Sequence, residues 1–184
     1  MSAPEITFAL LDRTQANAGA EDIQALHADG QADADDYPAR FRVQRRQPGF
    51  VLAEARHGGY LVAYASGMPL RPSTDWWRHL TAPLPDDVTT EHQGRTFALL
   101  DLLVRPSWRR QRIAETLHDM ILRGRAEERA TAKVPSSATA AQNAFQVWGW
   151  RRVGRTRDLG SPVADVLVKP ITRLADYLVS RLPG

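Results

Sequence analysis

The stretch 104-VRPSWRRQRIAETLHDMIL-122 decides how the rest of the chain is read, because it joins the end of an apolar strand to an amphipathic helix. Arginines fill the turn between the two elements, where a phosphate-binding turn would usually carry glycines. A helix N-terminus leaves backbone N–H groups unpaired and carries a partial positive charge. The turn is therefore either a site for a phosphate-bearing cofactor or a basic connector between two core elements.

Around this stretch, hydrophobic periodicity and turn residues predict a mixture of strands and helices. We expect strands at residues 6–13, 50–56, 60–68, 96–104, 131–134, 152–158 and 164–171. We expect helices at residues 20–28, 36–47, 111–128, 138–147 and 172–182. His57-Gly58-Gly59 predicts a hairpin turn, and a second turn is expected at 160-GSP-162. This order of elements predicts an α/β (mixed α+β) fold, with a mixed sheet and helices on both of its faces.

The composition is ordinary for a globular protein, with 43% hydrophobic and 24% charged residues in a chain of 184. This length suits one domain with a real core. The absence of cysteine excludes disulfides, thiolate zinc sites and a cysteine nucleophile. The five histidines lack the spacing of a helical metal site, so we expect no metal.

The formal net charge is +3, and nearly all of the basic residues are arginines. Acidic stretches such as 29-DGQADADD-36 offset them, so we expect no nucleic-acid partner. The apolar runs are too short to cross a bilayer, and no basic segment precedes the first of them. We therefore expect a cytoplasmic protein with no membrane partner and no signal peptide.

Two blocks of the sequence resemble signatures of one enzyme family. The run V-R-P-S-W-R-R-Q-R-I-A resembles the acyl-CoA-binding motif of the GNAT superfamily of CoA-dependent N-acyltransferases. That motif is a strand ending in Val, followed by [QR]-x-x-G-x-[GA] at the start of a long helix; Arg109 matches its first position and Ala114 its last. The run 141-AQNAFQVWGWRRVGR-155 resembles the next signature, a helix with an aromatic residue, then G-[FW] and a strand.

The resemblance implies a single GNAT-like domain over residues 1–184, with its core at 6–171 and a C-terminal helix at 172–182. It implies a mostly antiparallel sheet of six or seven strands. It also implies an N-acetyltransferase that transfers an acetyl group from acetyl-CoA, or an acyl group from another acyl-CoA, to a small-molecule primary amine, as a monomer or homodimer. The residues expected to bind the cofactor are Leu102, Leu103, Val104, Arg109, Arg110, Gln111, Arg112, Ile113, Ala114 and Phe145.

Asp101 is the candidate catalytic residue, because it resembles the family's acidic residue on this strand and is the one charge in FALLDLLV. A carboxylate in an apolar strand must be paired, hydrated or shifted in pKa. Asp101 is thus either the base that takes a proton from the amine or a buried structural acid paired with an arginine of a neighbouring strand. Glu54 is the alternative base. Together with Trp76 and Trp77 it is expected to contact the acceptor, unless the tryptophans fill a small satellite core.

Two positions depart from the family pattern. Arg112 stands where the motif has its central glycine; a positive φ there would be costly, whereas a helical φ would change only the bulk near the cofactor. Phe145 stands where the family often has a tyrosine that protonates the leaving thiolate, which leaves that proton to water, Tyr60, Tyr64 or a histidine. The alternative function is therefore a CoA-binding protein with weak or no catalysis, such as a sensor or assembly partner.

Overall fold

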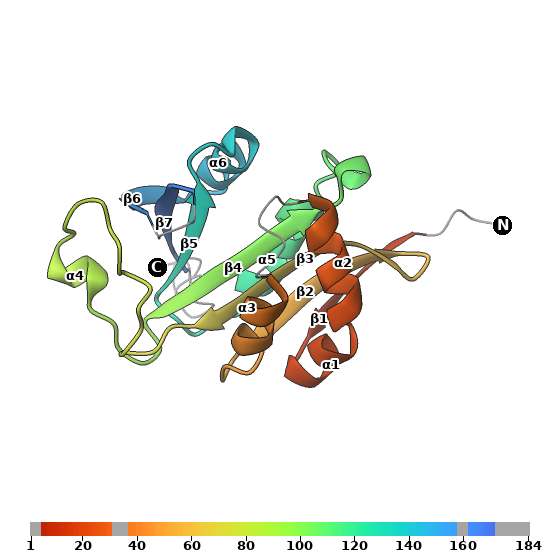
Figure 1. Cartoon of the computed structure of the whole chain (residues 1–184), viewed down its shortest axis with the longest axis horizontal. Helices are drawn as coiled ribbons and strands as arrows, with labels where there is room; N and C mark the ends of the chain where they lie inside the picture. The colour runs from red at the N-terminus through yellow and green to blue at the C-terminus, as the bar shows by residue number, and fades with distance from the viewer. Residues whose placement is uncertain (1–4, 31–36, 158–161, 172–184) are drawn as a thin grey trace, which may run out of the picture. The chain divides into compact units, whose positions relative to one another are not determined.

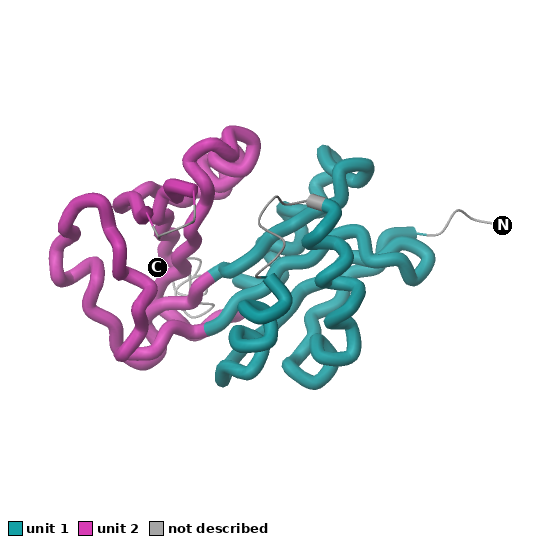
Figure 2. The backbone as a smooth tube through the Cα atoms, in the orientation of Figure 1, with its two compact units in different colours: residues 1–68, 99–123 teal, residues 69–98, 124–184 magenta. Residues whose placement is uncertain are grey.

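The computed structural model describes residues 5–30, 37–157 and 162–171. The chain divides into two compact units: residues 1–68 with 99–123 form unit 1, and residues 69–98 with 124–184 form unit 2 (Figure 2). The predicted helix at 172–182 lies outside the described residues, as do Gly160 and Ser161 of the predicted turn.

The elements of unit 1, including two strands that have most of their residues in it, are β1 (Ile6–Leu11), α1 (Arg13–Ala18), α2 (Ala20–Gly30), α3 (Tyr37–Gln44), β2 (Val51–His57), β3 (Tyr60–Pro69), β4 (Thr96–Val104), a 3-10 turn (Pro106–Trp108) and α5 (Ile113–Leu122). Those of unit 2 are α4 (Asp86–Thr89), β5 (Arg129–Pro135), α6 (Thr139–Val147), β6 (Arg151–Thr156) and β7 (Ala164–Pro170).

The predicted fold class is confirmed: over the described ranges the chain is a mixed α/β protein with a seven-stranded, mostly antiparallel sheet (Figure 1). In unit 1 the strand order is β1-β2-β3-β4, and in unit 2 it is β5-β7-β6. The pairs β1–β2, β2–β3, β5–β7 and β6–β7 are all antiparallel.

Helices cover both faces of the sheet in unit 1, with α1, α2 and α3 on one face and α5 on the other (Figure 1). The core on the first face consists of Ala16, Ile23, Leu26, Tyr37, Phe41, Phe50, Leu52, Leu61, Tyr64 and Leu103. On the second face the predicted stripe of Ile113, Leu117 and Ile121 is buried, and α5 packs on β2. Each such large apolar side chain contributes roughly 1.5–3 kcal/mol by leaving water.

The hairpin β2–β3 has its turn where the glycines predicted it. Gly58 and Gly59 have φ of 57° and 84°, and His57 pairs with Tyr60 across the turn. These left-handed conformations suit glycine because it has no Cβ.

The predicted helix at 111–128 is wrong at both ends. It begins only at Ile113, because Arg112 is left-handed with φ 59° and ψ 12°. It ends at Leu122, because Gly124 has φ 70° and turns the chain away from the helix axis. Glu127, expected in the helix, is instead buried in the following turn and paired with Arg125 at 2.6 Å.

Sequence analysis also missed α1. Asp12 and Gln15 form a capping box, in which the Asp12 carboxylate accepts from the Gln15 N–H at 2.9 Å and the Gln15 side chain accepts from the Asp12 N–H at 3.0 Å. The predicted first strand therefore stops at Leu11 rather than Arg13. The D-x-x-Q spacing was the available signal.

Candidate active site

The candidate site is built on β4, which is the most apolar of the strands predicted from the sequence. Its bounds are those predicted, Thr96–Val104. Asp101 points to the same face as Leu103, whose side chain belongs to the core beneath α1–α3. The Asp101 residue is only 9% exposed, so its carboxylate depends on protein groups for stabilisation.

Two polar groups face the Asp101 carboxylate. Ser66 of β3 donates its hydroxyl hydrogen to Oδ2 at 2.9 Å, and the Arg40 guanidinium of α3 lies 3.9 Å from Oδ1. Burial raises the pKa of Asp101 above its ordinary value of 3.8, and the Arg40 charge and the Ser66 hydrogen bond oppose that rise. The arginine comes from a helix, not from a neighbouring strand as the structural alternative supposed. A carboxyl with this pKa is a stronger base than an exposed aspartate.

A tyrosine pair lies beside this carboxylate. The hydroxyls of Tyr37 and Tyr64 are 2.7 Å apart in the buried core, and the His27 ring stacks on Tyr37 at 3.6 Å. Burial, and then the Asp101 charge, raise the pKa of both tyrosines above 10.0, so both keep their protons. Tyr60, the other tyrosine predicted as a possible proton donor, is 55% exposed and lies beneath Arg105.

The turn after β4 is the predicted phosphate site. Arg110 and Arg112 both have positive φ, 62° and 59°, a conformation that costs free energy for any residue with a Cβ. The glycine position of the motif thus keeps the backbone that favours glycine, although an arginine occupies it. The Arg112 side chain turns back to Glu115, with N–O distances of 2.8 and 3.1 Å, and is 82% exposed.

Backbone donors are available at the start of α5. No side chain caps this helix, and the Thr116 N–H bonds to the Arg112 carbonyl at 3.0 Å. The N–H groups of Ile113 and Ala114 precede that first helical hydrogen bond. Backbone amides after left-handed residues form anion-binding concavities. The turn therefore retains the features that a pyrophosphate needs.

The structure brings most of the predicted cofactor residues together in unit 1. Arg109, Arg110 and Gln111 are exposed in the turn, Ile113 is buried at the helix start, and Ala114 is half-buried. On β4, Leu102 and Val104 are half-buried, whereas the Leu103 side chain fills the core and leaves only its backbone for a ligand.

Arg105 is a structural arginine. Its Nε donates to the Leu61 carbonyl at 2.9 Å, its Nη1 contacts Asp29 of α2, and it lies 4.5 Å from the centre of the Tyr60 ring. Trp108 packs against His57 at 4.7 Å in the same region. These contacts brace the turn against the β2–β3 hairpin.

Phe145 lies in α6 of unit 2 and is buried. Its ring contacts Trp148 at 5.5 Å and Trp150 at 5.1 Å between centroids. Gly149 between the two tryptophans has φ 85°, which ends the helix and brings both rings to Phe145. The second sequence signature thus forms an aromatic cluster, and the position of the usual tyrosine carries no proton donor.

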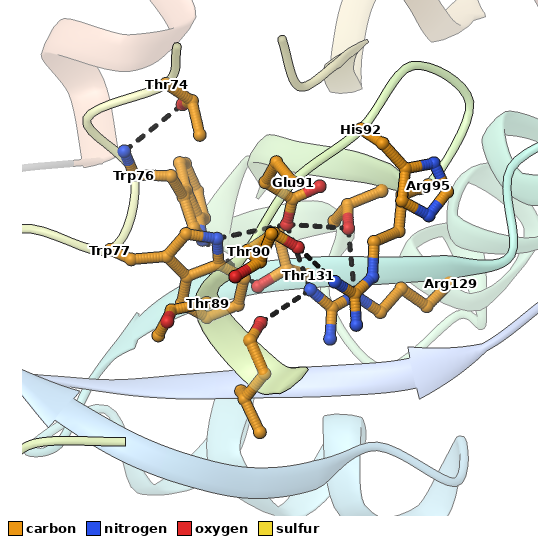
Figure 3. Close-up of polar contacts among 12 residues, drawn as sticks. Thr74, Trp76, Trp77, Thr89, Thr90, Glu91, His92, Arg95, Arg129 and Thr131 are labelled. Carbon is orange, nitrogen blue, oxygen red and sulfur yellow. Dashed lines mark hydrogen bonds and ion pairs between the residues drawn. The ribbon is translucent and has the colours of Figure 1, made fainter. Parts of the chain in front are cut away.

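Trp76 and Trp77 lie against β5 (Figure 3). The Trp76 indole donates to Thr131 at 3.1 Å, and Lys133 sits 5.0 Å from its ring centre. The Trp77 indole donates to Glu91 at 3.0 Å, and Arg129 lies 5.3 Å from its ring centre. These contacts favour the satellite-core alternative, and a contact with the acceptor stays a prediction.

Glu54 is also engaged. Its carboxylate lies 3.0 Å from Arg56, which pairs in turn with Asp22 of α2 at 2.8 Å. Its roles as alternative base and acceptor contact stay predictions. Sequence analysis missed Arg40, Ser66 and Tyr37.

Within the described ranges, no group of three or more histidine or acidic side chains is arranged to hold a metal ion. No helix in the same ranges has the length and hydrophobicity needed to span a membrane.

No curated protein sequence matches the chain significantly. The family model described as "Acetyltransferase (GNAT) family" matches residues 18–150. Similar solved structures include the ribosomal-protein-S18-alanine N-acetyltransferase from Escherichia coli (TM-score 0.62, 16% identity, covering 98% of this chain and 100% of that one). Others are Arabidopsis thaliana NAA60 in complex with acetyl-CoA (0.68, 15%, 91% and 100%) and aminoglycoside 6'-acetyltransferase type Ii (0.66, 13%, 90% and 97%). At these identities the structural similarity establishes the fold.

Proposed function

The chain belongs to the GNAT family of acetyltransferases, and from this membership we propose that it transfers an acetyl group from acetyl-CoA to a primary amine of a small molecule by direct attack. One observation carries the proposal: β4 holds a buried carboxylate, Asp101, and leads at its C-terminal end into the uncapped turn at residues 109–114. A base and a phosphate-binding turn thus share one short segment of unit 1.

The residues of this turn fit the cofactor. The amides of Ile113 and Ala114 and the exposed Arg109 and Arg110 would hold the pyrophosphate. The backbone of residues 102–104 would lie along the acyl-bearing arm. The expected contact of Phe145 with the cofactor stays a prediction. Acetyl-CoA supplies the thioester carbonyl that the amine attacks.

The proposed role of Asp101 follows from its surroundings. An amine attacks only through its neutral form, so a base must remove a proton from the ammonium. Asp101 must be ionised to do so, and Ser66 and Arg40 stabilise that ionised form while burial keeps the carboxylate basic. The proton that the leaving sulfur needs comes from water in this scheme, since Phe145 has none to give. A missing general acid lowers the rate about 100-fold.

The class of the acceptor is part of the proposal. The similar structures include enzymes named for a ribosomal protein and for aminoglycosides, so the family accommodates both protein and small-molecule acceptors. We propose a small amine for this chain. The single-domain organisation, the cytoplasmic location and the monomeric or homodimeric state stay predictions.

The second candidate is a GNAT-fold protein that binds CoA with weak or no catalysis. Two observations favour it: Phe145 stands in place of the usual acid, and Arg112 occupies a left-handed glycine position in the turn. Such a protein would serve as a sensor or assembly partner.

Calorimetric titration with acetyl-CoA, with ATP as a control ligand, is the first test. We expect micromolar binding of acetyl-CoA, and thiol release when a panel of primary amines is added. Binding without thiol release by any amine would favour the second candidate. No binding at millimolar acetyl-CoA would overturn both candidates.

A further inference from the structure

We propose that Arg40 binds an anionic group of the acceptor, a carboxylate or a phosphate, so that the acceptor is a small amine with negative charge close to the nitrogen that is acetylated. The inference rests on the proposed function, because it takes Asp101 as the base that faces the amine. It narrows the acceptor from any small amine to a zwitterionic one.

Within the described residues, no protein group accepts a hydrogen bond from Arg40. Its Nη2 lies 3.9 Å from Asp101 Oδ1, which is longer than a hydrogen bond of 2.7–3.2 Å. Over the ranges that the structure describes, no hydrogen bond from this guanidinium is found, and its side chain is 46% exposed. A guanidinium carries five N–H donors in a planar fork that matches carboxylate and phosphate oxygens. Arg40 can therefore offer a complete fork to a ligand.

Two other arginines of unit 1, Arg56 and Arg105, have their donors occupied by protein groups. Arg56 donates to Asp22 and to the Gly59 carbonyl, both at 2.8 Å, and Arg105 donates to the Leu61 carbonyl. Unlike these two, Arg40 donates no hydrogen bond to a described residue, and it lies beside the candidate base.

Arg40 is also held in place. Its guanidinium lies 5.3 Å from the centre of the Tyr37 ring, and Tyr37 is buried and tied through its hydroxyl to Tyr64 at 2.7 Å. A group fixed in this way loses little conformational freedom when a ligand binds. The Asp101 carboxylate and the Arg40 guanidinium therefore present a fixed pair of opposite charges.

The charge of α3 itself favours a zwitterion over a polycation. The segment 37-YPARFRVQRRQPG-49, which comprises α3 and the turn after it, carries four arginines and no acidic residue. A polycation would bring positive charge against these arginines. A zwitterion can place its ammonium at Asp101 and its anion at Arg40. Because these groups lie 3.9 Å apart, the nitrogen and the anion of the acceptor must be separated by only a few bonds.

The test compares amines that differ in one charge. Initial rates with glycine and glycinamide, and with O-phosphoethanolamine and ethanolamine, give kcat/KM ratios of anionic to neutral acceptor. We expect wild type to prefer the anionic member, and Arg40→Gln to reduce that ratio about 30-fold, the loss of a charge-assisted hydrogen-bonded pair. Arg40→Lys should restore part of it. A larger ratio for the glycine pair would identify the preferred anion as a carboxylate, and a larger ratio for the O-phosphoethanolamine pair would identify it as a phosphate.

A matched control separates the effect of a direct contact between Arg40 and the acceptor from the effect of removing one positive charge from α3. Arg42→Gln removes an exposed arginine of the same helix, and its ratio should change by less than about twofold, because a single exposed charge is screened by salt. Equal ratios in wild type and Arg40→Gln would overturn the inference and leave the acetyltransferase standing.

The inference stays testable without turnover. If no amine is acetylated, the same four amines are titrated calorimetrically into the acetyl-CoA complex. A binding preference for the anionic amines that Arg40→Gln removes would support the anion site, and the absence of any preference would overturn it. Failure of acetyl-CoA itself to bind would instead count against the proposed function.

Discussion

Both units bury carboxylates beside arginines, and two of these pairs, Glu91–Arg129 in unit 2 and Asp101–Arg40 in unit 1, are built differently. In unit 2, Glu91 Oε1 accepts hydrogen bonds from Trp77 at 3.0 Å, Thr96 at 2.9 Å and Arg129 at 2.9 Å (Figure 3). In unit 1, Asp101 accepts one hydrogen bond, from Ser66, and its arginine stands 3.9 Å away.

From this difference we propose that the Glu91–Arg129 pair is structural and that the Asp101–Arg40 pair is reactive. Arg129 is 13% exposed and also donates to Thr96 and to the Val88 carbonyl, so protein groups use its donors. Arg40 is 46% exposed and donates to no described group. A carboxylate oxygen with three hydrogen bonds is held by the fold, whereas a pair with few hydrogen bonds leaves both charges able to act on a ligand.

The largest expected effect concerns the pair in unit 1. Asp101→Asn keeps the size of the side chain but removes the base, so kcat/KM should fall by about 10²–10⁴ in a thiol-release assay. Thermal unfolding should show no loss of stability, because a buried charge has been removed. Wild-type rates in this variant would show that Asp101 is not the base and that its role is structural, like that of Glu91.

The corresponding change in unit 2 should act on stability. Glu91→Ala leaves Arg129 buried without its carboxylate, which should lower the free energy of unfolding by about 3–5 kcal/mol in urea denaturation. Glu91→Gln, which keeps one acceptor oxygen and the shape of the side chain, should cost less. A neutral result for Glu91→Ala would mean that the bonded pair is not what holds the connector, the segment at residues 70–95 that joins β3 to β4.

A third change tests the turn that adjoins the reactive pair. Ala114→Asp places negative charge at the start of α5, where the phosphate is expected, and should weaken acetyl-CoA binding by at least about 100-fold in calorimetry. The circular dichroism spectrum should match wild type, since Ala114 is only half-buried. An unchanged affinity would remove the cofactor-site assignment.

The pH dependence gives the smallest effect. The pKa of Asp101 is raised by burial above 3.8, so the folded state binds this proton more tightly than the unfolded state does. Between the unfolded and folded pKa values, stability from this group is lost as pH rises, whereas kcat/KM rises because the base ionises. Asp101→Asn should abolish both trends in pH-dependent unfolding and rate profiles. If stability and kcat/KM of the wild type changed in the same direction with pH, the assignment of Asp101 as the base would be contradicted.

Local sequence signals predicted the parts of the fold that depend on local pattern. The apolar run from Thr96 to Val104 gave its strand correctly, and the spacing of Ile113, Leu117 and Ile121 gave the buried stripe of α5. Gly58-Gly59 gave the hairpin. The ends of α5 were missed, because the backbone angles at Arg112 and Gly124 override the helical periodicity on either side.

Local sequence signals could not predict the partners of the candidate base. Asp101 stood out as the one charge in an apolar strand, but Ser66 and Arg40 reach it through strand register and helix packing over 35 and 61 positions of sequence. The left-handed angle of Arg112 was one of two alternatives that the motif allowed. Trp76 and Trp77 likewise fitted two environments, and their neighbours on β5 favour one of them.

The hydrogen bonds between the connector and β5 also affect the order in which the chain folds. The Glu91–Arg129 and Trp76–Thr131 hydrogen bonds span 38 and 55 positions of sequence. Non-local contacts of this kind require loop closure before they stabilise anything, and they slow folding. During synthesis the tryptophans leave the ribosome well before Thr131 does. The connector at residues 70–95 therefore becomes ordered only once β5 has emerged, which makes it a late-folding segment of unit 2.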